Sequence, residues 1–255
     1  MCGLVACLLY PTERTPETWI AIKHGFTQGL LANEKRGRDA SGIAVRQRNG
    51  RLQLHKAPLP AHQLVTTPGY TRLWQQVDAQ TTLILGHARY PTKGKTAVNA
   101  NNHPLVVDQV CGIHNGHVHN DDALFAHHAY PRQGQVDSEI IFRLLNQVVP
   151  QPTHPAAYVT EAVTQIRSLR GIFTFLANDQ RAPHQLVALK HTNPISLYYH
   201  PDWQVLLFSS SYLYLRQTFG HIVCHQMIPR DILMIFDAEK LPQYGHEPVA
   251  TVALP

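Results

Sequence analysis

The most constraining feature of this 255-residue chain is its beginning, where Met1 precedes Cys2 and Gly3. Residues 2–10 (CGLVACLLY) form a short apolar run that Pro11 ends, and such a bounded run is typical of a buried strand. Small side chains after an initiator methionine permit its removal, so we expect Cys2 to become the first residue. A central strand would then hold a cysteine rigidly at its start.

An N-terminal cysteine carries a thiol and a free α-amine on one residue. The amine has an ordinary pKa of about 7.7–8.0, so part of it is unprotonated near neutral pH and can act as a general base. A thiol is a strong nucleophile once it has lost its proton. Cys2 is therefore a candidate for both nucleophile and base, although a small buried apolar residue is the simpler interpretation of a cysteine by itself.

Composition narrows the classes of function. Hydrophobic residues make up 44% of the chain and supply a sizeable core, while charged residues make up only 15%. The net charge is +5, but Lys and Arg are scattered, which argues against nucleic-acid binding. Four cysteines without a CxxC pair or a secretory signal favour reduced thiols in the cytoplasm. No stretch reaches the roughly 20 apolar residues of a membrane span.

Local signals predict mixed helices and hairpins. Thr15, Pro16 and Glu17 are typical of a helix start, and apolar residues then recur on one face as far as Leu30. Asn49-Gly50 joins two expected strands as a hairpin turn. Helices are expected over 70–77, from about 120, after 137 and through 162–169, and other strands over 81–86, 105–107, 110–114, 172–177, 185–189, 195–199, 205–208 and 232–236. Polar stretches over 36–42 and 95–103 are expected to be loops, and 58–68 to be irregular. Hairpins separated by blocks of helices indicate a layered α+β domain.

Five motifs then occur in order: Cys2-Gly3, RGRDASG at 36–42, GHARYPTKG at 86–94, HNG at 114–116 and DSE at 137–139. Together they resemble class II glutamine amidotransferase domains, the branch of the Ntn (N-terminal nucleophile) hydrolases that uses an N-terminal cysteine. The likeness is to the glutaminase halves of amidophosphoribosyltransferase and glucosamine-6-phosphate synthase. The resemblance implies a single four-layer αββα sandwich over residues 1–255.

The resemblance also implies a role for each matching residue. Cys2 is the nucleophile, and the Asn115 side-chain amide and Gly116 backbone N–H form the oxyanion hole. Arg89 binds the substrate α-carboxylate with help from Thr92, a task that suits a guanidinium. The remaining matches are Asp137 for the substrate α-ammonium and Arg36 and Asp39 as braces for the nucleophile. The alternatives are a hairpin turn at Asn115-Gly116 and a helix N-cap at Asp137. Lys93 departs from the pattern, because some relatives carry His there.

The implied reaction is hydrolysis of L-glutamine to glutamate and ammonia through a thioester on Cys2, with no metal or cofactor. His114, His117 and His119 raise a metal site as an alternative, but on a strand His114 faces away from the other two, so structural histidines are expected. Because the chain ends at Pro255, we expect a separate synthase to receive the ammonia. The alternatives are a hydrolase of larger γ-glutamyl amides and a non-catalytic binding subunit, and the oligomeric state is not predicted.

Overall fold

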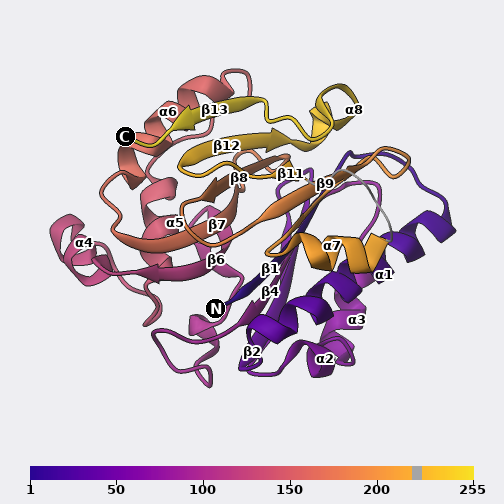
Figure 1. Cartoon of the computed structure of the whole chain (residues 1–255), viewed down its shortest axis with the longest axis horizontal. Helices are drawn as coiled ribbons and strands as arrows, with labels where there is room; N and C mark the ends of the chain where they lie inside the picture. The colour runs from indigo at the N-terminus through magenta and orange to yellow at the C-terminus, as the bar shows by residue number, and fades with distance from the viewer. Residues whose placement is uncertain (220–225) are drawn as a thin grey trace.

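Two antiparallel sheets stack face to face in a computed structural model that describes residues 1–219 and 226–255 (Figure 1). Cys224 lies outside the described residues. In spatial order, sheet A comprises β11 (Gln226–Met227), β9 (Ser196–His200), β10 (Val205–Ser209), β1 (Gly3–Leu9), β4 (Thr81–Arg89), β2 (Ala40–Gln47) and β3 (Leu52–Ala57). Sheet B comprises β13 (Ala250–Ala253), β12 (Ile232–Asp237), β8 (Gln185–Lys190), β7 (Gly171–Asp179), β6 (Val110–Val118) and β5 (Leu105–Val107).

Strand β1 lies in the middle of sheet A, between β10 and β4. Because side chains alternate along a strand, one set enters the core between the sheets and the other the core beneath the helices. The first set is Leu4, Ala6 and Leu8, and the second is Val5, Cys7 and Leu9. Burial on both faces explains the uninterrupted apolar run. The predicted buried strand is confirmed.

Helices cover the outer face of sheet A. They are α1 (Pro16–Asn33), α2 (Ala61–Leu64), α3 (Pro68–Trp74) and α7 (Tyr212–Phe219). The Thr15 hydroxyl accepts a hydrogen bond from Thr18 N at 3.3 Å, so the predicted N-cap is confirmed. Phe26 and Leu30 of α1 are buried against the sheet. Short α2 lies where the sequence predicts irregular chain, and α7 was not predicted.

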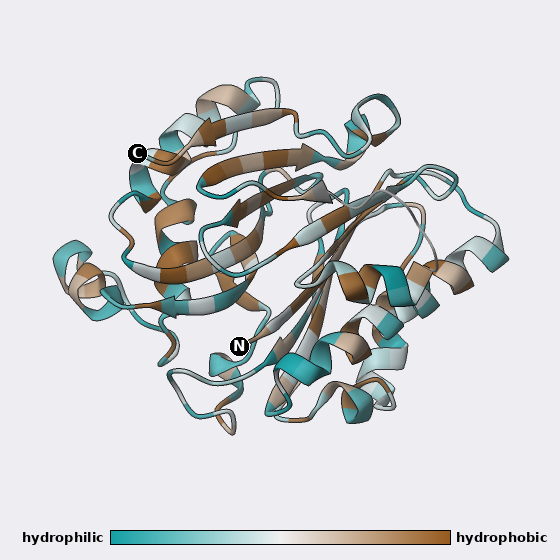
Figure 2. Cartoon of the chain, viewed as in Figure 1, coloured by the Kyte–Doolittle hydropathy of each residue, from teal (hydrophilic) through white to brown (hydrophobic). Residues whose placement is uncertain are grey.

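Helices α5 (Ser138–Asn146) and α6 (Pro155–Ile166) cover the outer face of sheet B. Phe142 of α5, Val159 of α6 and Phe173 of β7 pack into one core there. The hydrophobic segments concentrate in the strands and in the helices against them (Figure 2). The remaining elements are α4 (Asp121–His128), α8 (Leu241–Tyr244), η1 (Glu34–Arg36), η2 (Asn99–Asn101) and η3 (Ala238–Lys240). The four-layer αββα prediction is confirmed.

Strands β4 and β6 run beyond the ends that the sequence predicts and carry site residues there, and β2 begins earlier than predicted. Strand β4 continues to Arg89, β6 continues to Val118, and β2 begins at Ala40 inside the expected loop. Hydrophobic patterning ends too early because these polar side chains face the site instead of an apolar core. Ala40 pairs with Arg89, which holds the end of β4 in the sheet. Within the described ranges, no helix combines the length and apolarity that crossing a membrane requires.

Candidate active site

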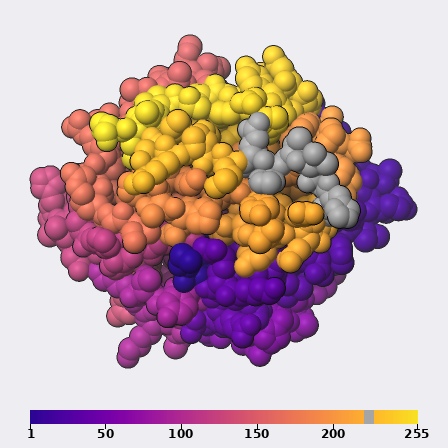
Figure 3. Space-filling model, in the orientation of Figure 1, coloured from indigo at the N-terminus to yellow at the C-terminus, as the bar shows by residue number. Residues whose placement is uncertain are grey.

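Cys2 lies directly before β1, where the ends of the two sheets approach each other (Figure 1). Its backbone N–H donates to Asn115 Oδ1 of sheet B at 2.9 Å. Its Sγ lies 3.4 Å from both the N and the O of Tyr90, which follows β4. Cys2 is only 8% exposed although Met1 is 64% exposed. The N-terminal atoms reach the surface between the purple and the orange segments (Figure 3).

The Cys2 thiol is held in its protonated form. Burial raises its pKa, while the Tyr90 backbone contact, the N-terminal charge and Arg89 oppose that rise. Cys7 and Cys111 are also buried and free, and burial raises the thiol pKa of both, that of Cys111 to about 11. Of these three thiols, Cys2 has Arg89 among the groups that lower its pKa. Activation at Cys2 still requires a base.

Arg36 and Asp39 brace the backbone around the nucleophile. Arg36 Nε donates to the Cys2 carbonyl at 3.0 Å, and the Asp39 N–H donates to the Arg89 carbonyl at 3.1 Å. These contacts involve the backbones of Cys2 and Arg89 and leave the thiol free.

Asn115 lies inside β6, paired with Thr174 of β7. The hairpin-turn alternative for Asn115-Gly116 is therefore wrong, because the strand continues to Val118. Asn115 Oδ1 accepts from Cys2 N, whereas Asn115 Nδ2 is buried and has no hydrogen-bond partner among the residues that the structure describes. A buried amide donor without a partner costs about 1–3 kcal/mol, so such groups are rare unless a ligand completes them.

Gly116 adopts a backbone conformation that requires glycine. Its φ is +141°, and a Cβ there would lie 1.8 Å from the Ile172 carbonyl oxygen of the neighbouring strand. Any side chain would therefore push β7 away from β6. The Asn-Gly pair thus combines an unpartnered side-chain donor with a backbone that no other residue can adopt without strain.

Arg89 is a buried cation whose hydrogen-bond partners are neutral. Nη1 donates to Asn102 Oδ1 at 2.8 Å, and Nη2 donates to the carbonyls of Lys93 and Gly94 at 2.7 and 3.0 Å. Among the residues that the structure describes, no carboxylate forms an ion pair with it. Burial lowers the pKa of Arg89, and the charges of Cys2, Asp137 and Asp39 oppose this. A buried guanidinium in this state favours an anionic ligand.

Asp137 occupies the N-cap position of α5 without capping it through its side chain. Its Oδ2 accepts instead from Val118 N at 2.7 Å and lies 3.5 Å from His117 Nδ1. Asp137 therefore lies at the N-cap position that the alternative predicted, but its side chain does not form the capping hydrogen bond. The hydrogen bond from Val118 holds the Asp137 carboxylate at the end of β6, two residues beyond Gly116.

Thr92 and Lys93 belong to the loop after β4. Thr92 is exposed. Lys93 Nζ forms ion pairs with Asp121 at 2.6 Å and Asp122 at 2.8 Å, at the start of α4. Arg132 pairs with the same two carboxylates. This four-residue network ties the loop to α4.

Two buried histidines next to these residues, His87 and His103, were not predicted from sequence. The rings of His87 and His103 stack with centroids 4.3 Å apart, and His87 Nε2 lies 3.0 Å from the His114 carbonyl oxygen. His117 and His119 lie together with centroids 5.2 Å apart, whereas His114 contacts Ser138 at 2.7 Å, as the strand argument expected. Across residues 1–219 and 226–255, no group of three or more His, Cys, Asp or Glu could hold a metal ion.

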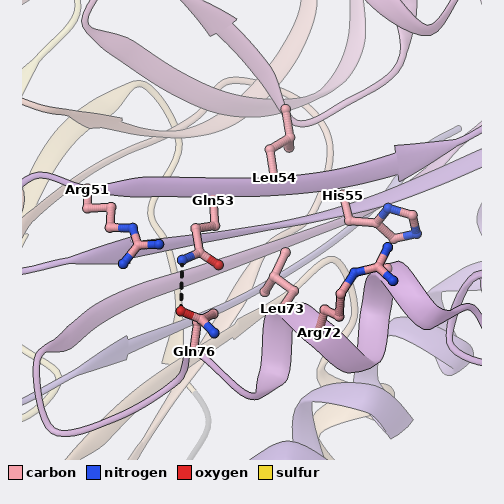
Figure 4. Close-up of a pocket in the computed structure, with 8 residues that line it drawn as sticks. Arg51, Gln53, Leu54, His55, Arg72, Leu73 and Gln76 are labelled. Atoms are coloured by element: carbon pink, nitrogen blue, oxygen red, sulfur yellow. Dashed lines mark hydrogen bonds between the residues drawn. The ribbon is translucent and has the colours of Figure 1, made fainter.

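Two surface pockets lie apart from Cys2. One, of about 360 Å³, lies between β3 and α3, where Gln53 and His55 point toward the helix and Leu54 points away (Figure 4). Arg72 lies beside His55 there. The other, of about 430 Å³, lies beside α6 and is lined in part by His191 and Asp231. Neither pocket contains a residue of the five motifs.

The arrangement of two antiparallel sheets between helices, with a cysteine at the start of the central strand, defines the Ntn-hydrolase fold. The glutamine amidotransferase domain family matches residues 87–217, just over half of the chain. The chain therefore belongs to the class II glutamine amidotransferase domains. The match contains Arg89, Asn115 and Asp137, and Cys2 lies ahead of it.

Curated relatives agree with this family. Glutamine–fructose-6-phosphate aminotransferase of Treponema pallidum is 30% identical over 67% of this chain and 26% of its own length. The Yersinia pseudotuberculosis protein of that name is 27% identical over 76% of this chain and 29% of its own length. The chain thus spans less than a third of the length of either relative.

Solved structures show the same fold. Glutamine phosphoribosylpyrophosphate amidotransferase of B. subtilis superposes with a TM-score of 0.71 at 16% identity, covering all of this chain and 49% of its own. A glutamine aminotransferase class-II domain protein from Silicibacter pomeroyi has a TM-score of 0.55 at 15% identity, covering 93% of this chain and 95% of its own.

Proposed function

We propose that this chain hydrolyses L-glutamine to glutamate and ammonia, with Cys2 as nucleophile after removal of Met1. The observation that carries the proposal is Asn115, whose Oδ1 holds the Cys2 nitrogen while its buried Nδ2 lacks a partner. A donor in that place is suited to the negative charge that develops on a carbonyl oxygen under attack from the adjacent thiol.

The first step is attack of Cys2 Sγ on the side-chain amide carbon of glutamine. In the proposal, the Cys2 nitrogen becomes an α-amine with N–H groups for Asn115 Oδ1 and a lone pair for the thiol proton. The oxyanion of the tetrahedral intermediate accepts from Asn115 Nδ2 and Gly116 N. The C–N bond then breaks, the amine returns its proton to the leaving ammonia, and a γ-glutamyl thioester remains on Cys2.

Water then completes the reaction. The α-amine takes a proton from water as the water oxygen attacks the thioester carbonyl, the same two donors hold the oxyanion, and the C–S bond breaks to release glutamate. The thiol regains its proton from the amine, which restores the starting state. Since burial raises the pKa of the Cys2 thiol, a base beside it is needed in every cycle.

The substrate head group supplies the charges that the site lacks. In the proposal, the α-carboxylate binds Arg89, which has only neutral partners in the structure. The α-ammonium binds Asp137, whose Oδ2 already accepts from Val118 N, and Thr92 contacts the substrate from the loop. Opposite charges at fixed positions orient the amide toward Cys2.

We also propose that the ammonia passes to a synthase in trans. Ammonia is largely protonated at neutral pH and then is not nucleophilic, so direct transfer preserves its reactivity. The curated relatives are named for amino transfer to fructose-6-phosphate, which supports an acceptor reaction without identifying the acceptor here. Co-purification of the chain from cell extract, followed by assay for a glutamine-dependent product, tests this part.

Covalent labelling tests the core of the proposal. The chain is treated with a glutamine-shaped electrophile, and peptide mass spectrometry locates the label, with Cys2→Ala as control. We expect modification at Cys2 that excess glutamine prevents. An absence of labelling on a chain whose intact mass confirms Cys2 as first residue would contradict free glutamine as substrate and favour larger γ-glutamyl amides. A mature chain that retains Met1 would contradict the proposed base.

A further inference from the structure

Lys56 of β3 directs its ammonium group away from solvent and onto the loop that follows η2. Its Nζ donates to the Asn102 carbonyl at 2.6 Å and to the Pro104 carbonyl at 3.1 Å. No carboxylate pairs with it in the described part of the chain. Asn99 of η2 in turn donates to β3, from its Nδ2 to the backbone carbonyl of Lys56 at 3.0 Å. Strand β3 and the loop are therefore joined by three hydrogen bonds.

Asn102 carries this contact to the site. It is fully buried, and its Oδ1 accepts from Arg89 Nη1 at 2.8 Å. Its Nδ2 donates to the Thr96 carbonyl at 2.8 Å and to Asn99 Oδ1 at 3.1 Å, so its side-chain amide is fixed at both ends. The Nη1 hydrogen bond of the Arg89 guanidinium thus depends on where the Asn102 backbone lies, and Lys56 contacts that backbone.

We propose that Lys56 is a positioning residue for the substrate α-carboxylate, acting on Arg89 through Asn102. This inference rests on the proposed function of Arg89 and assigns a role to a residue outside the five motifs. Removing the Lys56 ammonium leaves the buried carbonyls of Asn102 and Pro104 without their donor, which favours movement of the loop. Because two guanidinium–carboxylate bonds need a defined plane, a small rotation of Arg89 weakens carboxylate binding.

The charges around Lys56 favour the same role. Burial lowers its pKa to about 8, with a further lowering from Arg89 and an opposing effect from Cys111. His87 and His103 also face it, and its charge helps to lower the pKa of each imidazole. A substrate carboxylate on Arg89 would bring a negative charge close to two cations that otherwise repel each other. Glutamine binding is then expected to favour the charged form of Lys56.

The test compares two substrates that differ only in the carboxylate, glutamine and 4-aminobutanamide. For the unaltered chain and for Lys56→Met, kcat/KM is measured with both, and the ratio of the two values is compared. We expect the ratio to fall about tenfold in Lys56→Met, since one charge-assisted contact is lost. Both substrates use the Cys2 amine and thiol, so those steps cancel in the ratio.

Arg181→Gln is the matched control. Arg181 also donates to backbone carbonyls, those of Asn146 at 3.2 Å and Val148 at 2.9 Å at the C-terminal end of α5, and it pairs with Asp179 at 2.6 Å. It should lower the melting temperature by a comparable amount and leave the ratio unchanged. Lys56→Gln, which keeps a shorter donor, serves if Lys56→Met does not fold, and we expect an intermediate ratio.

The outcomes separate the two proposals. An unchanged ratio in Lys56→Met and Lys56→Gln, with glutamine still hydrolysed, would overturn the role of Lys56 alone. A chain that begins at Cys2 and neither binds nor hydrolyses glutamine would overturn the proposed function and this inference together. A ratio that falls equally in Arg181→Gln would assign the effect to general destabilisation and likewise overturn the positioning role.

Discussion

Two buried asparagines at the site, Asn115 on β6 and Asn102 after η2, are used in opposite ways. The Asn102 side-chain amide has partners on both its oxygen and its nitrogen. The Asn115 amide has a partner on its oxygen only, and its nitrogen is buried without one. The Asn102 amide therefore has its hydrogen bonds without a ligand, whereas the Asn115 amide has a donor left to offer one.

The difference indicates which groups position and which groups bind. A buried donor without a partner lowers stability, while a fully bonded amide stabilises its surroundings, so of the two amides only that of Asn115 has a donor left for a ligand beside Cys2. By this argument, the Asn102 side chain positions Arg89, and the Asn115 side-chain amide is the group that would donate to an oxyanion.

Replacing Asn115 by alanine should affect turnover far more than binding. We expect kcat for glutamine to fall about 10²–10³-fold with KM changed only a few-fold, because the lost donor acts mainly in the transition state. Steady-state kinetics with Asn102→Ala as comparison is the measurement. Asn102→Ala should instead raise KM. Equal effects on kcat in both variants would contradict the distinction.

Lowering the pH should weaken the contacts that His87 makes with the loop and with β6, and so lower the free energy of unfolding. His87 joins them, since it stacks on His103 and contacts the His114 carbonyl, and burial lowers its pKa from 6.5 to about 3. The unfolded chain therefore takes up this proton below pH 6.5 while the folded chain resists it, so stability is lost as pH falls from 6.5 toward 3. At about pH 4.5, His87 alone should account for about 3 kcal/mol.

The free energy of unfolding, measured with urea at about pH 6.5 and at about pH 4.5, reports this loss. The pH dependence should be smaller in His87→Asn and unchanged in His127→Asn, because His127 is exposed. A wild-type stability that is constant between these pH values would show that the His87 imidazole is not held neutral.

Replacing Arg89 by lysine should weaken substrate binding without removing catalysis. Arg89 uses two nitrogens for three neutral acceptors, and an ammonium cannot keep these bonds and also bind a carboxylate in one plane. We expect KM for glutamine to rise about 10–100-fold, with kcat within a few-fold. Arg72→Gln, in the pocket of Figure 4, should leave both constants unchanged. A fall confined to kcat would place Arg89 in the chemical step.

The smallest effect should come from the surface network on the loop. Lys93 pairs with Asp121 and Asp122 at the edge of the site, and partly exposed ion pairs contribute about 0.2–1 kcal/mol. Lys93→Met should therefore raise KM about two- to threefold. Added salt should raise the wild-type KM in the same direction and have less effect on the variant. A larger rise would mean that the Lys93 side chain itself contacts substrate.

Much of the fold could be predicted from the sequence. The apolar run of β1, the Thr15 cap of α1 and the turn at Asn49-Gly50 each follow from local rules, and all three are found. Errors cluster where strands enter the site, since β4 and β6 continue through polar residues that carry no hydrophobic period. Helix α7 was missed because only Leu215 in it is buried.

The family, the four-layer fold and the order of the motif residues follow from short-range patterns and motif spacing, which the amino-acid sequence contains directly. Three features of the site depend on contacts between distant segments: within the described residues Asn115 Nδ2 lacks a partner, Arg89 has neutral acceptors, and Lys56 reaches Asn102. Cys2 and Asn115 are 113 positions apart, and Lys56 and Asn102 are 46 apart. Hydrogen bonds over such separations depend on strand register and sheet stacking, which no local pattern encodes.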